Sequence, residues 1–196
     1  MPAYGHAGAI HTPKKPMSDS VLEQWLAREE ELRALQTQDA GAGTNTMQDI
    51  RSLTGLEQMQ GMMNGTRTGP SIGKTMDFLL VELDSGRAVF QGTPGDKYFN
   101  PMGTVHGGWY ATLLDSALGC AVHTLMPVGR AYTTSQLSVN LVKAIPPKVR
   151  RVRAEGKVVH CGRQLATAEA RLFGPDGTLY AHATTTCLVF ELPTKS

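Results

Sequence analysis

The spacing of apolar residues predicts that the chain begins with helices. Apolar side chains recur at roughly helical spacing over residues 18–38, where Ser18 or Asp19 can cap a helix. A second helix is predicted over residues 47–63, and the glycine-rich polar stretches on either side of it are typical of loops. Residues 1–17, which carry three prolines, instead predict a flexible tail or an arm that docks elsewhere.

The period of the pattern then changes to that of strands. Residues 74–94 alternate on both sides of an Asp-Ser-Gly turn and predict a β-hairpin. One long helix is predicted over residues 104–125. Four further strands are predicted over residues 131–145, 149–162, 163–174 and 178–192. A hairpin, one long helix and an antiparallel meander, in this order, predict an α+β fold in which one sheet lies on or around a central helix.

The predicted central helix carries one charged side chain in an otherwise uncharged stretch. Between Tyr98 and Gly129 the sole formally charged residue is Asp115, and apolar residues point in nearly all directions around the helix. A helix that is apolar all round is a buried helix. Because an unpaired buried charge is costly, we expect Asp115 to be neutral, hydrogen-bonded or functional.

A pair of glycines, Gly107 and Gly108, stands at the predicted start of this helix. Backbone N–H groups at a helix start are unpaired, and they can hold a carbonyl oxygen that gains negative charge. Asp115 follows Gly107 by eight residues, or about 12 Å at about 1.5 Å per residue. That distance is too long for one helix to use both groups on one atom. We therefore expect a carbonyl held at Gly107 to meet the Asp115 of a second subunit in a dimer.

Composition and charge fit a folded globular protein rather than a disordered or nucleic-acid-binding one. Of the 196 residues, 41% are hydrophobic and 18% charged, and the net charge is only +2. No apolar stretch approaches the roughly 18 residues of a membrane span. The three widely spaced cysteines, Cys120, Cys161 and Cys187, favour reduced thiols over disulfides or a zinc site, so we expect a cytoplasmic protein.

Several segments together resemble the hotdog-fold acyl-CoA thioesterases of the phenylacetate-degradation, or PaaI, type. These segments are NPMGTVHGGWYATLLDSALGCA, TTSQLSVNLVKAIP, GRQLATAEARL and DGTLYAHATTT. Their most specific feature is an Asn followed after five residues by His-Gly-Gly, with an Asp nine residues after the His. The resemblance covers about residues 48–192, the expected hotdog domain. Residues 1–47 form an N-terminal tail and helical extension that has no counterpart in a minimal hotdog domain.

The resemblance implies an enzyme that hydrolyses acyl-CoA thioesters to a free acid and coenzyme A, without a metal or other cofactor. Asp115 matches the catalytic carboxylate of the family, which acts as nucleophile or as general base on water. Gly107 matches the helix-start N–H that polarises the thioester carbonyl. Asn100 and His106 match the pair that orients the thioester and the loop. Family members have their sites at subunit interfaces, so a homodimer or a homotetramer built as a dimer of dimers is implied.

The resemblance also places a hydroxyl beside the carboxylate. Thr134 falls where related enzymes have this hydroxyl, although Thr133 or Ser135 could serve instead.

Other residues are candidates for holding the substrate. Gly108 lets a ligand atom approach the backbone, and Trp109 either lines the acyl pocket or packs in the core. Arg163 follows a glycine at a strand corner and is a candidate contact for the phosphates of coenzyme A. The basic run at residues 148–153 either binds those phosphates or forms a solvated strand face.

Two other functions remain compatible with these patterns. One is a non-catalytic hotdog protein that binds and senses acyl-CoA, and the other is a hydratase or dehydratase acting on acyl thioesters. The intact Asn, His, Gly and Asp positions favour hydrolysis over both. The N-terminal extension has three open roles: packing over the sheet, covering the acyl pocket or adding an oligomer contact.

The remaining histidines and the methionines suggest no chemistry of their own. His123, His160 and His182 lack the spacing of metal ligands and are predicted to be ordinary residues. The methionines of the second predicted helix form either a pliable pocket wall or simply core. They are Met59, Met62 and Met63.

Overall fold

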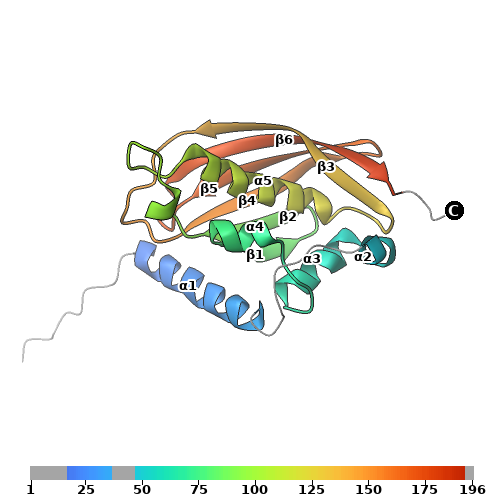
Figure 1. Cartoon of the computed structure of the whole chain (residues 1–196), viewed down its shortest axis with the longest axis horizontal. Helices are drawn as coiled ribbons and strands as arrows, with labels where there is room; N and C mark the ends of the chain where they lie inside the picture. Colours follow the sequence, from blue (N-terminus) through green and yellow to red (C-terminus); the bar gives the residue numbers. More distant parts are fainter. Residues whose placement is uncertain (1–16, 37–46, 193–196) are drawn as a thin grey trace, which may run out of the picture.

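The computed structural model describes residues 17–36 and 47–192, which form one sheet, a central helix and several peripheral helices (Figure 1). The helices are α1 (Met17–Gln36), α2 (Met47–Ser52), α3 (Gly55–Met63), α4 (Ser71–Met76), the 3₁₀ turn η1 (Asp96–Tyr98) and α5 (Gly107–His123). The strands are β1 (Phe78–Asp84), β2 (Arg87–Gly92), β3 (Arg130–Leu141), β4 (Val152–Cys161), β5 (Leu165–Phe173) and β6 (Leu179–Glu191). Apart from its last residue, the tail predicted over residues 1–17 lies outside the described residues.

The six strands form one antiparallel sheet in the order β1-β2-β4-β5-β6-β3. The helix α5 runs along one face of this sheet, as Figure 1 shows. The predicted α+β architecture of a sheet around one central helix is thus confirmed. Strand β3 lies at an edge of the sheet, so among the described strands it pairs with β6 alone and leaves its other side open.

The core forms where α5 meets the sheet. Trp109, Leu113 and Leu118 are each at most 1% exposed, as expected for a helix that is apolar on nearly every side. Gly156 of β4 allows the helix to come close, because a β-carbon there would lie 2.3 Å from the carbonyl oxygen of Ala117. This contact fixes the height of α5 over the sheet and, with it, the position of every side chain that the helix carries.

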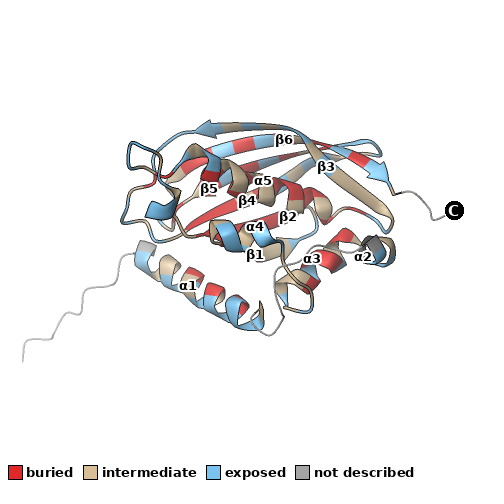
Figure 2. Cartoon of the chain, viewed as in Figure 1, coloured by how far each residue is buried: buried red, intermediate tan, exposed pale blue. Residues whose placement is uncertain are grey.

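The opposite face of β1 and β2 is covered by α1. Alternate residues of a strand point to opposite faces, so Phe78 and Leu80 join the core under α5 while Leu79 and Val81 point away from it. There they pack with Val89 of β2 and with Leu32 of α1. Figure 2 shows the result as buried positions along one side of α1 and exposed ones along the other. Of the roles open to the N-terminal extension, packing over the sheet is confirmed.

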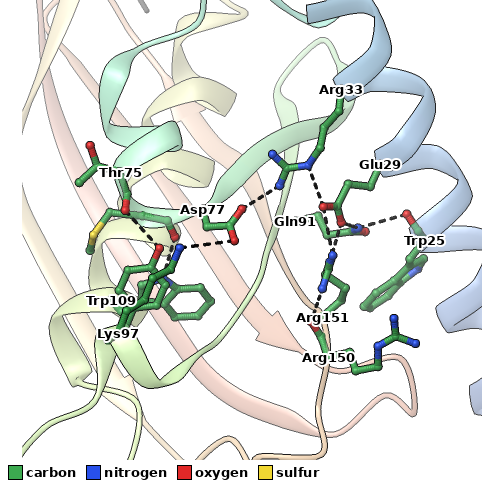
Figure 3. Close-up of polar contacts among 12 residues, drawn as sticks. Trp25, Glu29, Arg33, Thr75, Asp77, Gln91, Lys97, Trp109, Arg150 and Arg151 are labelled. Carbon is green, nitrogen blue, oxygen red and sulfur yellow. Dashed lines mark hydrogen bonds and ion pairs between the residues drawn. The ribbon is translucent and has the colours of Figure 1, made fainter. Parts of the chain in front are cut away.

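A buried polar network completes the docking of α1 (Figure 3). Glu29 is 5% exposed and accepts hydrogen bonds from Arg151 at 2.6 Å and from Gln91 at 2.7 Å. The side-chain oxygen of Gln91 accepts in turn from Nε of Arg153 at 2.9 Å. Both predictions for the basic run 148–153 are therefore wrong for these two arginines, which hold the extension on the sheet.

Two predicted elements each contain a helix boundary that the apolar pattern did not predict. The helix predicted over residues 47–63 is divided into α2 and α3, because Thr54 and Glu57 form a reciprocal capping box that starts a new helix at Gly55. The predicted hairpin begins at Phe78 rather than at residue 74, since residues 71–76 form α4. That short helix ends at Asp77, which adopts the left-handed conformation with φ of 51°.

Candidate active site

The start of α5 is built by His106 and the two glycines after it. His106 is the N-cap residue, and its Nδ1 accepts a hydrogen bond from the N–H of Gly108 at 2.8 Å. A β-carbon at Gly108 would lie 3.0 Å from that Nδ1, so glycine permits the close cap. The helix starts at Gly107 rather than at the predicted residue 104, and His106 fixes the loop that enters it.

The loop before α5 is folded around the side chain of Asn100. Its Oδ1 accepts from the N–H groups of Met102 at 2.9 Å and Thr104 at 3.2 Å, and its Nδ2 donates to the Thr104 hydroxyl at 3.0 Å. Downstream, the N–H of His106 donates to the carbonyl of Tyr98 at 2.7 Å. Asn100 and His106 therefore both shape the loop before the helix start, and their orienting of a thioester stays a prediction.

The N–H of Gly107 is available at the positive end of α5. As the first residue of the helix, Gly107 has no carbonyl one turn earlier to accept its N–H. Among the described residues, no loop or cap acceptor takes this N–H either. A backbone donor in this place can hold a carbonyl oxygen that becomes negative.

The carboxylate of Asp115 lies two turns further along α5 and is half-buried. Its Oδ1 accepts a hydrogen bond from the Thr134 hydroxyl of β3 at 3.1 Å. Of the three hydroxyl residues proposed for this position, Thr134 is thus the one that contacts the carboxylate, whereas the Ser135 hydroxyl donates to the carbonyl of Thr186. The two predicted groups, carboxylate and hydroxyl, meet between the central helix and the edge strand.

A cavity of about 620 Å³ opens beside Asp115 and Thr134. Its wall is mostly apolar and comes from α3, β1 and β2, with the loop before α4 and the end of α1 at its margin. These residues include Met59, Met62, Phe78, Leu80, Phe90, Pro70 and Gln36. The methionines of α3 therefore serve both predicted roles, since Met59 is buried in the core and also lines the cavity.

The glycine end of α5 borders a second, smaller cavity of about 290 Å³. His106, Gly108 and Trp109 line this cavity, and Asp115 does not. Trp109 is 1% exposed, donates its indole N–H to the carbonyl of Met76 and packs as a core residue; it lies outside the wall of the larger cavity. Within one chain, Gly108 at the helix start and the predicted carboxylate thus border different cavities.

Arg163 is not brought to either cavity. It lies exposed between β4 and β5, and its carbonyl accepts a hydrogen bond from the guanidinium of Arg130. A contact between Arg163 and the phosphates of coenzyme A stays a prediction.

Two further ionisable side chains line the larger cavity near Asp115. Burial, with the nearby Asp115 charge, raises the pKa of the Cys120 thiol to about 12. Burial also raises the pKa of the Tyr132 phenol well above its ordinary value of 10.0. Both groups are therefore protonated at neutral pH, and Cys120 is not a thiolate nucleophile.

The sequence did not predict that one further residue lines the larger cavity. His123, predicted to be ordinary, lies at the end of α5, lines the larger cavity and keeps a buried Nδ1 that has no hydrogen-bond partner among the described residues. Its signal in the sequence is its spacing, because it follows Asp115 by eight residues and so lies on a similar side of the helix.

Comparisons with known proteins agree with this geometry. Residues 102–181 match the family described as the thioesterase superfamily. No curated protein matches the sequence. Of the described helices, none is long and apolar enough to cross a membrane.

Solved structures share the fold over most of their length. A thioesterase family protein from Silicibacter pomeroyi is 27% identical, with a TM-score of 0.56, covering 61% of this chain and 89% of that one. A phenylacetic acid degradation-related protein from Ralstonia eutropha is 23% identical, with a TM-score of 0.61, and the match covers 67% of this chain and 98% of that one. A variant of the phenylacetic acid degradation protein PaaI from Thermus thermophilus is 24% identical, with a TM-score of 0.54, and the match covers 60% of this chain and 97% of that one.

The sheet wrapped along α5 and these structural neighbours show that the chain has the hotdog fold, and the family match over residues 102–181 shows that its central helix and the strands after it are similar to the thioesterase superfamily. The fold implied by the sequence motifs is thereby confirmed, and the resemblance to thioesterases is supported.

Proposed function

We propose that the protein hydrolyses acyl-CoA thioesters, at a site that combines the helix start of one subunit with Asp115 of another. The observation that carries this proposal is the hydrogen bond from Thr134 to Asp115 at the mouth of a largely apolar cavity. A carboxylate oriented by a hydroxyl can attack a carbonyl or take a proton from water, and an apolar cavity suits an acyl chain.

The need for two subunits follows from the geometry of α5. Gly107 and Asp115 are about 12 Å apart along the helix axis, at about 1.5 Å per residue, and the cavity that Gly108 borders at the helix start is not the one that Asp115 borders. If two copies place their α5 helices side by side and antiparallel, the Gly107 of each copy comes near the Asp115 of the other. The open side of the edge strand β3 supports such an assembly, because an unpaired strand edge can pair with a second copy.

The reaction then proceeds through a tetrahedral intermediate, which forms and then collapses. The N–H of Gly107 donates to the thioester carbonyl oxygen, while Asp115 of the other copy either attacks the carbonyl carbon or removes a proton from an attacking water. Negative charge collects on the oxygen at the helix start, and the bond to sulfur breaks as it returns. If Asp115 attacks, the acyl group passes to its carboxylate as a mixed anhydride while the thiolate of coenzyme A leaves, and water then hydrolyses the anhydride and restores Asp115. If Asp115 acts as base, the proton that it takes from water passes to the leaving thiolate. By either route one water is consumed, and the products are a carboxylic acid and the thiol of coenzyme A. None of these steps calls for a metal or a cofactor.

The place in the cell follows from the cysteines. The three free cysteines, which are half-buried or buried, suit a reducing compartment, and we assign the protein to the cytoplasm on that ground.

The test is an assay of thioester hydrolysis over a panel of aryl- and fatty-acyl-CoAs, in which the free thiol that is released is measured. The Asp115→Asn and Asp115→Ala variants should lose at least about a hundredfold in kcat, the scale of a lost catalytic base. Asp19→Asn, at an exposed residue of α1, is the matched control and should behave as the wild type. Wild-type turnover in both Asp115 variants would show that Asp115 is not the catalytic carboxylate. Tight acyl-CoA binding by the wild type without turnover would instead favour a sensor of acyl-CoA.

A further inference from the structure

The end of α4 holds the segment that leads into α5. The carbonyl of Thr75 accepts a hydrogen bond from the Tyr98 hydroxyl at 3.1 Å. The carbonyl of the next residue, Met76, accepts from the Trp109 indole N–H at 2.9 Å. The rings of Tyr98 and Trp109 stack, with 5.8 Å between their centroids and 29° between their planes. Met76, Tyr98 and Trp109 all line the smaller cavity beside the start of α5, so these contacts fix its wall.

Asp77, the residue after Met76, joins the same segments through its charge. Its Oδ2 lies 3.8 Å from the ammonium of Lys97, the residue before Tyr98. Its other oxygen, Oδ1, accepts a hydrogen bond from the guanidinium of Arg33 in α1 at 2.8 Å. The carboxylate of Asp77 therefore lies between the N-terminal extension and the loop before α5, as Figure 3 shows.

The backbone of Asp77 keeps the carboxylate in this place. Asp77 has φ of 51°, and it alone has a positive φ among the described residues other than glycine. Its N–H donates to the carbonyl of Gly73, and its carbonyl accepts from the N–H of Thr93 at 3.0 Å. A residue with a side chain persists in the left-handed conformation only where its surroundings hold it. The ends of α4 and β2 thus set the direction in which the Asp77 side chain leaves the backbone.

Arg33 connects Asp77 to the polar network that docks α1. Its Nε donates to Oε1 of Glu29 at 2.9 Å, while its Nη2 donates to Asp77. A guanidinium presents its donors in a fixed fork, so one arginine can hold two carboxylates at a set spacing. Because Glu29 is buried against the sheet, a continuous path of polar contacts runs from the docked extension to the wall of the cavity at the start of α5.

We propose that Asp77 is a positioning residue for substrate binding, and that Arg33 of the N-terminal extension fixes its carboxylate. The inference rests on the proposed function, because it takes the cavity at the start of α5 as a place where part of the thioester substrate binds. Asp77 follows Met76 in the chain and pairs with Lys97, the neighbour of Tyr98. Its carboxylate therefore sets the spacing between two residues of the cavity wall, and α1 acts on substrate binding as well as covering the sheet.

The experiment measures steady-state kinetics on the best acyl-CoA and separates KM from kcat. Asp77→Asn keeps the size of the side chain and its tolerance of the left-handed conformation, but it removes the charge. We expect KM to rise about fivefold while kcat changes by less than about twofold, because a cavity wall contacts the substrate equally before and during the reaction. Arg33→Met removes one of the two cations and should raise KM about threefold, and Arg33→Lys should recover part of that loss.

Matched controls and a double variant separate positioning from a general loss of stability. Arg28→Met removes an α1 arginine that pairs with Glu31 rather than with Asp77, and Asp84→Asn removes an ion-paired aspartate at the far end of β1. Both controls should keep the wild-type KM. The double variant Arg33→Met/Asp77→Asn should match Asp77→Asn alone, since both changes break the same contact. Urea unfolding confirms that each variant is folded under the assay conditions.

Hydrogen exchange tests the same path without turnover. The amides of residues 96–109, followed by mass spectrometry, should exchange faster in Asp77→Asn and in Arg33→Met than in the wild type, and at the wild-type rate in Arg28→Met. Exchange that stays the same in Asp77→Asn and Arg33→Met overturns the path from α1 to this loop.

The outcomes distinguish this inference from the proposed function. An unchanged KM in a folded, active Asp77→Asn variant overturns the role of Asp77 in binding substrate. If the wild type hydrolyses none of the acyl-CoAs, the proposed function fails, and the Kd of a non-hydrolysable acyl-CoA thioether, measured by calorimetry, takes the place of KM. Equal Kd values for the wild type and Asp77→Asn then overturn the inference, and a wild type that does not bind the thioether overturns both proposals.

Discussion

The hydroxyl of Thr134 lies 3.1 Å from Oδ1 of Asp115 and donates a hydrogen bond to it. The bond joins the central helix to the edge strand β3, two elements whose relative position is set by the core beneath them. It also explains how a carboxylate is tolerated in a helix that is otherwise apolar, since the charge is only half-buried and has a donor. One oxygen is thus held, and the carboxylate keeps a defined orientation toward the cavity.

Thr134→Val should therefore slow hydrolysis. Valine keeps the shape of threonine but cannot donate, so we expect kcat to fall by about tenfold or more, as for the loss of a hydrogen bond to a charged group. Thr134→Ser retains the hydroxyl and should recover most of the rate. Steady-state kinetics on the best acyl-CoA measures both. Thr184→Val, at an exposed position of β6, is the matched control. A Thr134→Val enzyme with the wild-type kcat would show that this bond has no part in the reaction.

The docking of α1 depends on the carboxylate of Glu29. Burial raises the pKa of Glu29, but hydrogen bonds from Arg151, Gln91 and Arg33 outweigh it, and the pKa lies below its ordinary value of 4.5. Glu29→Gln removes the negative charge and leaves the largely buried Arg151 without it. We expect a loss of about 3 kcal/mol in the free energy of unfolding, as for one partner removed from a buried ion pair.

Urea unfolding at neutral pH measures the effect of Glu29→Gln, with Glu30→Gln at the exposed neighbouring residue as control. Equal midpoints for Glu29→Gln, Glu30→Gln and the wild type would mean that the network in Figure 3 does not hold α1 in place.

The buried His123 makes stability depend on pH in the mildly acidic range. Burial lowers its pKa in the folded state below the ordinary value of 6.5, so the unfolded chain binds a proton there that the folded chain does not. The free energy of unfolding should thus fall as pH drops below 6.5, by at most about 1.4 kcal/mol per pH unit, until the folded-state pKa is reached.

Denaturant unfolding of the wild type and of His123→Phe between pH 7 and pH 5 checks this dependence. The variant should show a flatter curve over that range, while the effect of the carboxylates appears only at lower pH. Parallel curves for the two proteins would be inconsistent with a buried, neutral His123.

Much of the fold could be predicted from the sequence because its patterns are local. The alternation over residues 74–94 predicted the hairpin of β1 and β2, and the all-round apolar pattern of α5 predicted its burial. A local motif also indicates the division of the second predicted helix, namely the Thr-x-x-Glu capping-box signature at Thr54 and Glu57. The spacing of apolar residues alone does not indicate this division, because the helical spacing continues across the break.

What could not be predicted depends on contacts between distant segments. Glu29 and Arg151 are 122 residues apart in the chain, and nothing near either residue indicates its partner. For the same reason the basic run 148–153 by itself predicts a solvated or phosphate-binding surface rather than a buried contact with α1. His123 looked ordinary because its hydrogen-bond partner is Gln58, a residue of another helix, 65 positions earlier.

The central claim is that each site takes Gly107 from one subunit and Asp115 from another, and mixed subunits test it most directly. Gly107→Pro removes the N–H of the first helical residue, where proline is tolerated, and the extended His106 before it suits a following proline. Asp115→Asn removes the carboxylate. Each variant alone should be inactive.

Co-expression of the two variants in equal amounts gives mixed dimers, in which one of the two sites has both an intact Gly107 and an intact Asp115. We predict recovery of about a quarter of the wild-type rate, because about half of randomly formed dimers are mixed and each of these has one good site. Native mass spectrometry confirms that mixed dimers are present. A mixture that contains them and yet stays as inactive as its two components would contradict a site shared between subunits.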